Sequence, residues 1–266
     1  MKDFKFPRNL QYTRFKTPRS FNVTTVLTKK LFVIGVGPGS PMYLTDVAKD
    51  AIYRCQYIAG YEYTLNIIED IIDRKIQEVY EVTMSNQERI YQDIYLKMKD
   101  SDYCGIPFTG DVNFSESEVV DRLLELFGDD NVEIIPGISS IQIAAAKSRV
   151  PLDKAHIVTF HVSGDIEQKK LELVKAILEQ KSVILLPRPW PRDITRRFME
   201  SDIAIFLKEN GIDTSNLKVW VFENLTQYNK ETIFKGKVNE LEKMEFSELS
   251  VMVIDQVKRQ TYLQFG

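Results

Sequence analysis

Three short loops hold the residues whose types and spacing suggest ligand binding. The first, Gly35 to Pro41, contains three glycines and two prolines. Glycine lets the main chain turn through positive φ and approach a ligand without a Cβ in the way, while proline stiffens the loop. The other two loops, 108–115 and 135–140, combine glycine with small polar residues. Each loop follows an apolar run typical of a strand, and α/β proteins place ligands at the carboxyl edge of their sheets. The three loops therefore predict one shared cleft.

Each loop also has a purely structural interpretation. Gly110-Asp111 is typical of an Asx turn, and Ser139 or Ser140 of a helix N-cap. The first loop departs from the dinucleotide fingerprint, because its third glycine comes one position early and five residues separate Gly39 from the expected N-cap Thr45. No Gly-Lys-Ser/Thr follows it, so it is not a phosphate-binding Walker loop. These departures disfavour an oxidoreductase with a nicotinamide or flavin site.

Few other residues offer reactive side chains. The sequence holds two histidines, His156 and His161, which excludes a His-rich metal centre, and we expect no metal. Its two cysteines, Cys55 and Cys104, lack metal-ligand spacing and are expected to be reduced thiols in a cytoplasmic protein. No G-x-S-x-G nucleophile elbow accompanies the histidines. His161 ends a predicted strand, where it is either a proton acceptor or a structural, hydrogen-bonded histidine.

Composition indicates a globular protein with a substantial core. The chain has 266 residues, 44% of them hydrophobic and 27% charged, with a net charge of −3 that disfavours nucleic acid as a partner. No apolar run approaches the length of a membrane span. Residues 1–30 are basic, and an organelle address, an anion-binding arm, a start-codon artefact and a partly disordered extension all remain open for them. The remaining chain is divided into domains at 31–115 and 116–256 and a tail at 257–266.

The elements that must position the loops follow from hydrophobic periodicity. Up to residue 135, strands are expected at 31–35, 57–60, 76–82, 103–109 and 132–135, and helices at 45–55, 64–73, 86–100 and 116–127. Beyond it, strands are expected at 155–161, 182–187, 218–223, 231–234 and 249–255, and helices at 139–148, 166–180, 194–209 and 238–244. Strand–helix alternation followed by clustered strands predicts an α/β fold of two domains, a mainly parallel N-terminal sheet and a mixed C-terminal sheet, both with helices.

The three loops also carry a family resemblance. The stretch from Gly35 to Thr45, GVGPGSPMYLT, resembles the opening motif of the tetrapyrrole methylases. Thr109-Gly110-Asp111 resembles their second motif, SGDP, and residues 136–142 with the alanines 144–146 resemble the third. Order and spacing agree, and the resemblance extends over 31–255. It implies a two-domain tetrapyrrole methylase fold that binds S-adenosylmethionine between its domains and a tetrapyrrole in the adjoining trough.

Within that family, the chain resembles the branch that methylates cobalt-precorrin-7 at C5 in cobalamin synthesis. The third motif, Thr159-Phe160-His161 and the run from Trp220 to Leu225 carry this likeness. Val162 and Ser163 replace the Gly-Arg that follows the histidine in that branch, Val112 replaces a proline and Ser40 an acid. These departures leave open another acceptor, such as a different precorrin, diphthine or ribosomal RNA. A non-catalytic protein that binds the cofactor is a further alternative.

The resemblance also implies roles for individual residues. The cofactor pocket is expected to be lined by Pro38, Gly110, Asp111, Val112, Phe114, Ser139, Ser140, Ile141, Leu186 and Asn224. The macrocycle is expected near Gly37, Gly39, Ser40 and Thr45. His161 is the candidate base, and Arg188, Arg192, Arg196 and Arg197 either bind carboxylates of the macrocycle or form a solvated helix face. The resemblance further implies a homodimer. Because the chain ends near where a C5 enzyme of that branch ends, a C15-methylase with decarboxylase activity is expected as a separate partner.

Overall fold

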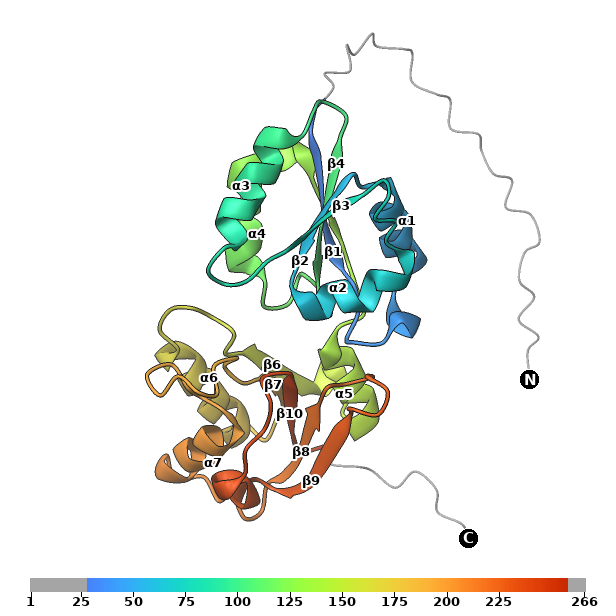
Figure 1. The fold of residues 1–266 in the computed structure, drawn as a ribbon. Coiled ribbons are helices and arrows are strands. Elements are labelled where there is room, and N and C mark those ends of the chain that lie inside the picture. Colours follow the sequence, from blue (N-terminus) through green and yellow to red (C-terminus); the bar gives the residue numbers. More distant parts are fainter. Residues whose placement is uncertain (1–27, 258–266) are drawn as a thin grey trace, which may run out of the picture.

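The computed structural model describes residues 28–257, which form two α/β domains, one above the other in Figure 1. The basic extension expected at 1–30 and the tail expected at 257–266 lie almost wholly outside the described residues. Lys30 is the first residue of β1, and Lys29 donates a hydrogen bond to the Tyr95 carbonyl. Within the described residues, no helix is long and apolar enough to span a membrane.

The N-terminal domain is built on a five-stranded parallel sheet of order β3-β2-β4-β1-β5. Its strands are β1 (Lys30–Gly35), β2 (Tyr57–Gly60), β3 (Glu78–Glu81), β4 (Tyr103–Phe108) and β5 (Val132–Ile135). Its helices are α1 (Asp46–Arg54), α2 (Glu62–Ile68), α3 (Gln87–Lys97) and α4 (Ser117–Phe127), with short 3₁₀ turns at Pro41–Tyr43, Glu69–Ile71 and Asp129–Asn131.

Alternation along β1 explains the two layers of helices in this domain. Leu31 and Val33 belong to the core that α3 and α4 cover, and Phe32 and Ile34 belong to the core under α1 and α2. Successive side chains of a strand point to opposite faces, so a continuous apolar run in a central strand needs cover on both sides. Figure 1 shows α3 and α4 on one side of the sheet and α1 on the other.

The sheet order corrects the domain boundary expected after Ser115. The strand β5 pairs in parallel with β1, with Val33 opposite Ile134, and α4 covers the same sheet. An apolar strand this short needs a neighbouring strand for its backbone hydrogen bonds, and β1 offers a free edge beside it. The N-terminal domain therefore runs to Ile135, and the chain crosses to the second domain over residues 136–139.

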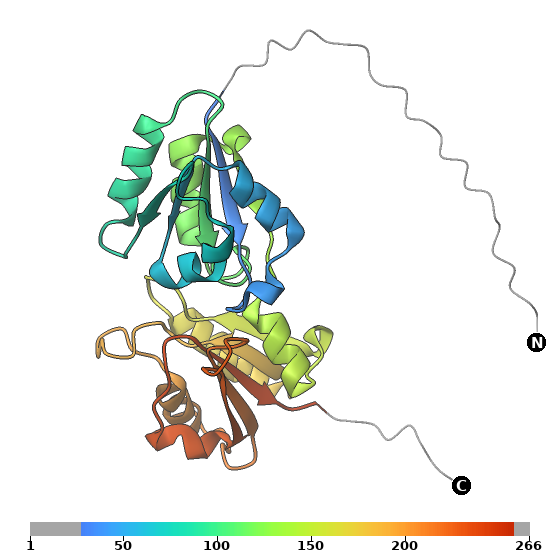
Figure 2. The ribbon, with the colours of Figure 1, turned by 45° about the vertical axis from the view of Figure 1, so that its right-hand side comes forward.

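The C-terminal domain has a mixed sheet of order β6-β7-β10-β8-β9, as the sequence predicts. Only β6 and β7 are parallel, and the other neighbours run antiparallel. Its strands are β6 (Ala155–Thr159), β7 (Ser182–Leu186), β8 (Lys218–Glu223), β9 (Thr232–Lys237) and β10 (Ser250–Asp255). Its helices are α5 (Ser140–Ser148), α6 (Glu167–Leu178) and α7 (Glu200–Glu209), with 3₁₀ turns at Leu152–Lys154 and Val238–Lys243. Figures 1 and 2 show α5 on one face of this sheet and α6 and α7 on the other.

The helix expected from Ile194 is the largest local error of the sequence prediction, because α7 begins only at Glu200. Residues 187–199 form a loop instead. Pro189 and Pro191 remove backbone donors, and the Asp193 carboxylate accepts hydrogen bonds from the Thr195 N–H and hydroxyl. Such local side-chain bonds compete with helix formation. The segment 238–244 is likewise a 3₁₀ turn rather than an α-helix.

Candidate active site between the two domains

The three glycine loops meet at the domain junction, as the sequence predicts. The Gly110 N–H donates to the Gly37 carbonyl at 2.7 Å, and the Gly37 N–H donates to the Gly110 carbonyl at 3.2 Å. A Cβ placed on Gly137 would lie 2.2 Å from the Gly110 carbonyl oxygen and 2.7 Å from the Gly35 carbonyl oxygen. Only glycine permits this backbone contact, so the three loops form a single unit.

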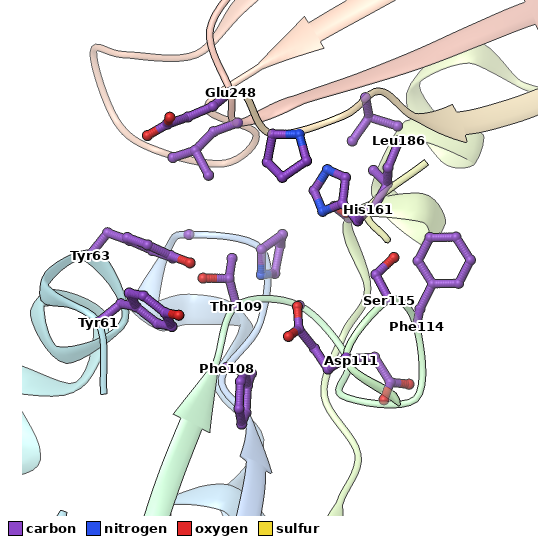
Figure 3. Close-up of a pocket in the computed structure, with 18 of the residues that line it drawn as sticks. Tyr61, Tyr63, Phe108, Thr109, Asp111, Phe114, Ser115, His161, Leu186 and Glu248 are labelled. Carbon is purple, nitrogen blue, oxygen red and sulfur yellow. The ribbon is translucent and has the colours of Figure 1, made fainter. Parts of the chain in front are cut away.

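A cavity of about 620 Å³ opens beside this unit, and both domains line it. In Figure 3, Tyr61, Tyr63 and Thr109 of the N-terminal domain face His161, Leu186 and Glu248 of the C-terminal domain across the space. Direct hydrogen bonds hold the two domains together around it. Ser115 bonds Thr159 through their hydroxyls at 2.7 Å, and the Ser40 N–H donates to the Thr226 hydroxyl at 3.0 Å.

Most of the predicted site residues lie at this cavity. The lining includes Pro38, Gly39, Gly110, Asp111, Phe114, Ser139, Ser140, His161, Leu186 and Asn224. The Asp111 carboxylate oxygen Oδ1 accepts bonds from the Asn113 N–H and side-chain amide, which forms the expected Asx turn and fixes the carboxylate at the cavity edge. Ser139 caps α5 in a capping box with Gln142, as the structural interpretation of that loop predicts, and it also lines the cavity.

Five predicted residues are not brought to the cavity, and each has a structural reason. Val112 packs in the core of the N-terminal domain and Ile141 in that of the C-terminal domain, with 1% and 4% of their surfaces exposed. Thr45 caps α1 by accepting a bond from the Ala48 N–H. The Ser40 hydroxyl accepts a hydrogen bond from the Met42 N–H, and both the N–H and the carbonyl of Gly37 are hydrogen-bonded to Gly110.

Several cavity residues escaped the sequence prediction. They include Tyr61, Tyr63, Glu116, Glu118, Arg122, Trp190 and Glu248. The first two follow β2 at the same carboxyl edge as the predicted loops, so the edge rule itself could have found them. Glu116 stands two residues beyond Phe114, at the N-cap of α4. Glu118 and Arg122 follow on the same helix, and Trp190 and Glu248 come from loops of the C-terminal domain.

The His161 imidazole is held at the cavity in a neutral form. Its ring donates a hydrogen bond to the Pro187 carbonyl, and Nε2 is buried without a partner among residues 28–257. Burial lowers the pKa of His161 to about 4, against the smaller raising effect of the Pro187 bond, because an apolar surrounding disfavours the imidazolium. The unpaired Nε2 lone pair can therefore accept a hydrogen bond from a ligand, but the imidazole is a weak base.

Glu116 shows the opposite result of the same physical cause. Burial, with the charge of Glu118 as a second cause, raises the pKa of the Glu116 carboxyl to about 7. The Glu118 carboxylate itself is held ionised, because the side chain and the N–H of Ser163 donate to it and lower its pKa. The cavity thus has one carboxyl that titrates near neutral pH beside one that stays charged.

Three of the four predicted anion-binding arginines have internal partners. Arg188 is buried and donates to the carbonyls of Val162, Gly164 and Arg196. Arg196 pairs with Asp193 at 2.7 Å, and Arg197 pairs with Asp202 at 2.9 Å. These contacts order the loop 187–199, and neither interpretation of the cluster describes them. Arg192 is exposed and lines a neighbouring cavity of about 710 Å³.

Fold and site together define a two-domain α/β enzyme with a ligand cavity at the domain junction. The family model for "Tetrapyrrole (Corrin/Porphyrin) Methylases" matches residues 30–242, so the chain belongs to this family and is a methyltransferase.

Known relatives and structures agree with this assignment. A probable cobalt-precorrin-7 C(5)-methyltransferase of Methanocaldococcus jannaschii is 31% identical over 226 residues, which cover 85% of this chain and 97% of that protein. The crystal structure of the methyltransferase CobJ has a TM-score of 0.65 at 16% identity, covering 85% of this chain and 94% of that one. A uroporphyrin-III C-methyl transferase from Thermus thermophilus, solved with S-adenyl homocysteine, has a TM-score of 0.61 at 16% identity, covering 85% and 91%.

Proposed function

We propose that this chain transfers the methyl group of S-adenosylmethionine to a carbon of a cobalt-corrinoid precursor, namely C5 of cobalt-precorrin-7. The convergence of three glycine loops on one cavity between the domains carries the proposal. The match to the M. jannaschii relative covers 97% of that protein, and its name supports the choice of acceptor.

The residues at the cavity fit the methyl donor. Asp111 offers a carboxylate whose Oδ2 has no partner among residues 28–257, and this charge suits the ammonium or sulfonium of the donor. Phe114, Leu186 and Leu225 supply apolar surface for the adenine ring. The buried His161 Nε2 lacks a partner in the described chain and can accept a hydrogen bond from the ribose. The capping box takes up the N–H groups of Ser139 and Ile141, but the Ser140 N–H, at the cavity, has no partner among residues 28–257 and can receive the donor's carboxylate.

The reaction requires mainly that the protein align the methyl donor with the acceptor carbon. The sulfonium supplies an electrophilic methyl group, which an electron-rich carbon of the reduced macrocycle attacks. The two walls hold donor and acceptor in line and exclude water, and this positioning is worth several kcal/mol of barrier, on the order of 7–11 in favourable cases. Pro38 and Gly39 lie at the cavity beside the turn 225–227. There we place the edge of the macrocycle.

The test is direct. Calorimetry should show one S-adenosylmethionine per chain, and incubation with cobalt-precorrin-7 and radiolabelled donor should yield one methyl per macrocycle at C5 by nuclear magnetic resonance. Turnover on another precorrin but not on cobalt-precorrin-7 would mean that the chain is a methyltransferase of this family with a different acceptor. Donor binding without transfer to any corrinoid would favour a non-catalytic protein and reject the proposal.

The assembly and location of the enzyme belong to the same proposal. We place it in the cytoplasm as a homodimer that meets a separate C15-methylating decarboxylase. Sedimentation of the purified chain tests the dimer, and co-purification tests the partner.

A further inference from the structure

We propose that Glu116 accepts the proton that leaves the acceptor when its carbon is methylated. The inference rests on the proposed methyltransferase function and deepens it, because it assigns the step that the histidine was expected to perform. It stands on the placement of one carboxyl at the cavity and on what its neighbours are bonded to.

Glu116 is free to act on a ligand. It lines the cavity at the N-cap of α4, is half-buried, and has no side-chain hydrogen bond or ion pair within residues 28–257. A carboxyl partly withdrawn from water without a partner is costly, so its presence at the cavity calls for an explanation.

The polar neighbours of Glu116 are engaged elsewhere. The Tyr61 hydroxyl donates to Gln87 Oε1 at 3.0 Å, and the Tyr61 ring stacks on Tyr63 with ring centroids 5.8 Å apart. The Arg122 guanidinium is paired with Glu88 at 3.0 Å. These hydroxyl and guanidinium groups bond other partners, so neither of them occupies the carboxyl that Glu116 brings to the cavity lining.

The charged and titratable groups around Glu116 also set its proton affinity. They are Glu118 and Arg122 on α4, Tyr61 and Tyr63 at the start of α2, and Tyr91 on α3. The tyrosines have raised pKa values, mainly through burial, and stay neutral hydroxyls. With a pKa of about 7, Glu116 can take a proton in the site and return it to water at neutral pH, the property that favours a general base.

The step balances without a further reactant. The acceptor carbon gives an electron pair to the methyl carbon, and the methyl–sulfur bond breaks with its pair left on sulfur as S-adenosylhomocysteine. The methylated macrocycle then loses one proton, from that carbon or from a ring nitrogen conjugated with it, to the Glu116 carboxylate. Glu116 becomes a neutral carboxylic acid and afterwards releases this proton to solvent.

The test compares three variants of one helix. Glu116→Gln removes the base and keeps the shape, Glu116→Asp keeps a base at a shorter reach, and Glu125→Gln is the matched control, since Glu125 is exposed on α4 away from the cavity. Single-turnover methyl transfer to cobalt-precorrin-7 is measured across pH, with the affinity for S-adenosylmethionine measured beside it. General-base catalysis contributes about 10²–10⁴-fold, so the Gln variant should lose about 100-fold or more at pH 8.

The pH profile separates a proton acceptor from a structural residue. Wild type and Glu125→Gln should lose rate as pH falls below about 7, since Glu116 then holds its proton. Glu116→Gln should show a flat profile and bind the donor as wild type does, whereas Glu116→Asp should keep a pH-dependent limb. An unchanged acid limb in the Gln variant overturns the proposal.

A second readout needs no acceptor. Difference infrared titration of the enzyme should show a carboxylic acid band with a midpoint near pH 7 that Glu116→Gln removes and Glu125→Gln keeps. A midpoint below pH 5 overturns the role of Glu116 alone. Absence of transfer to every corrinoid by wild type rejects the proposed function and this step with it, so the two failures are told apart.

Discussion

The two walls of the cavity carry titratable groups of different kind, Glu116 on α4 of the N-terminal domain and His161 after β6 of the C-terminal domain. Burial favours the neutral form of both. It raises the pKa of the carboxyl to about 7 and lowers that of the imidazole to about 4. The same physical effect therefore brings one group to working pH and removes the other from it. On our proposal, proton transfer therefore takes place at the N-terminal wall, while the C-terminal wall contributes the unpaired His161 lone pair and apolar surface.

The largest effect on cofactor binding and stability is expected from a substitution at Gly137, where the three glycine loops meet between the two domains. In Gly137→Ala the new methyl would lie 2.2 Å from the Gly110 carbonyl oxygen, so the loops must separate. We expect at least tenfold weaker binding of S-adenosylmethionine, and about 1–3 kcal/mol lower free energy of unfolding, as for other overpacked sites. Calorimetry and urea unfolding measure both.

Gly164→Ala is the matched control for that change. Nothing lies within 4 Å of the position its Cβ would take, although it follows the cavity residue Ser163. Its affinity and stability should equal those of wild type. Wild-type affinity in Gly137→Ala would show that the loop contact does not shape the site.

The second prediction asks what His161 does. Its folded pKa, about 4, lies below the ordinary value of about 6.5, so the unfolded chain takes up the proton first. The wild type therefore loses stability as pH falls from about 6.5 to about 4, by up to roughly 3 kcal/mol at 1.36 kcal/mol per pKa unit. In His161→Asn this loss should be absent from unfolding curves. The fall in methyl-transfer rate at acid pH should remain in this variant. Its disappearance would mean that His161, and not Glu116, is the base.

How far the sequence could go follows from the same contrast. Gly35, Gly110 and Gly137 could be placed at one edge, because apolar strands followed by glycine turns obey a general rule of α/β sheets. Glu116 could not be chosen, since its proton affinity arises from burial by residues distant in sequence. His161 was the candidate base as the imidazole near the loops, and the burial that lowers its pKa is likewise invisible in the sequence. The boundary after Ser115 was wrong because the pairing of β5 with β1 is a tertiary choice that its own four residues do not encode.

The third prediction concerns a buried carboxyl that has no access to the cavity. Glu200, at the start of α7, is fully buried, and burial raises its pKa to about 7. This folded pKa lies above the ordinary value, so the native state resists ionisation and loses stability as pH rises from about 4.5 to about 7. Glu200→Gln should unfold with about 1–2 kcal/mol more free energy than wild type at pH 8, a value reduced for the new amide's own burial, and with equal free energy at pH 4. Methyl transfer should keep its acid limb in this variant. A lost limb would mean that the titration belongs to Glu200 and not to the cavity.

The smallest effect is expected from the neighbour that tunes the N-terminal wall. The Glu118 charge is the second cause of the raised pKa of Glu116, after burial. Glu118→Gln removes that charge. Its amide oxygen can still accept the hydrogen bond from the Ser163 hydroxyl, which joins the two domains. The carboxyl of Glu116 should then ionise more readily, so the acid limb of methyl transfer should move to lower pH by a fraction of a unit while the rate at pH 8 stays unchanged. A shift to higher pH would contradict the electrostatic account, because losing a nearby negative charge can only lower the pKa of a carboxyl. Because burial is the larger cause, the pKa of Glu116 should stay above its ordinary value in this variant. The difference that remains measures how much burial alone raises this pKa.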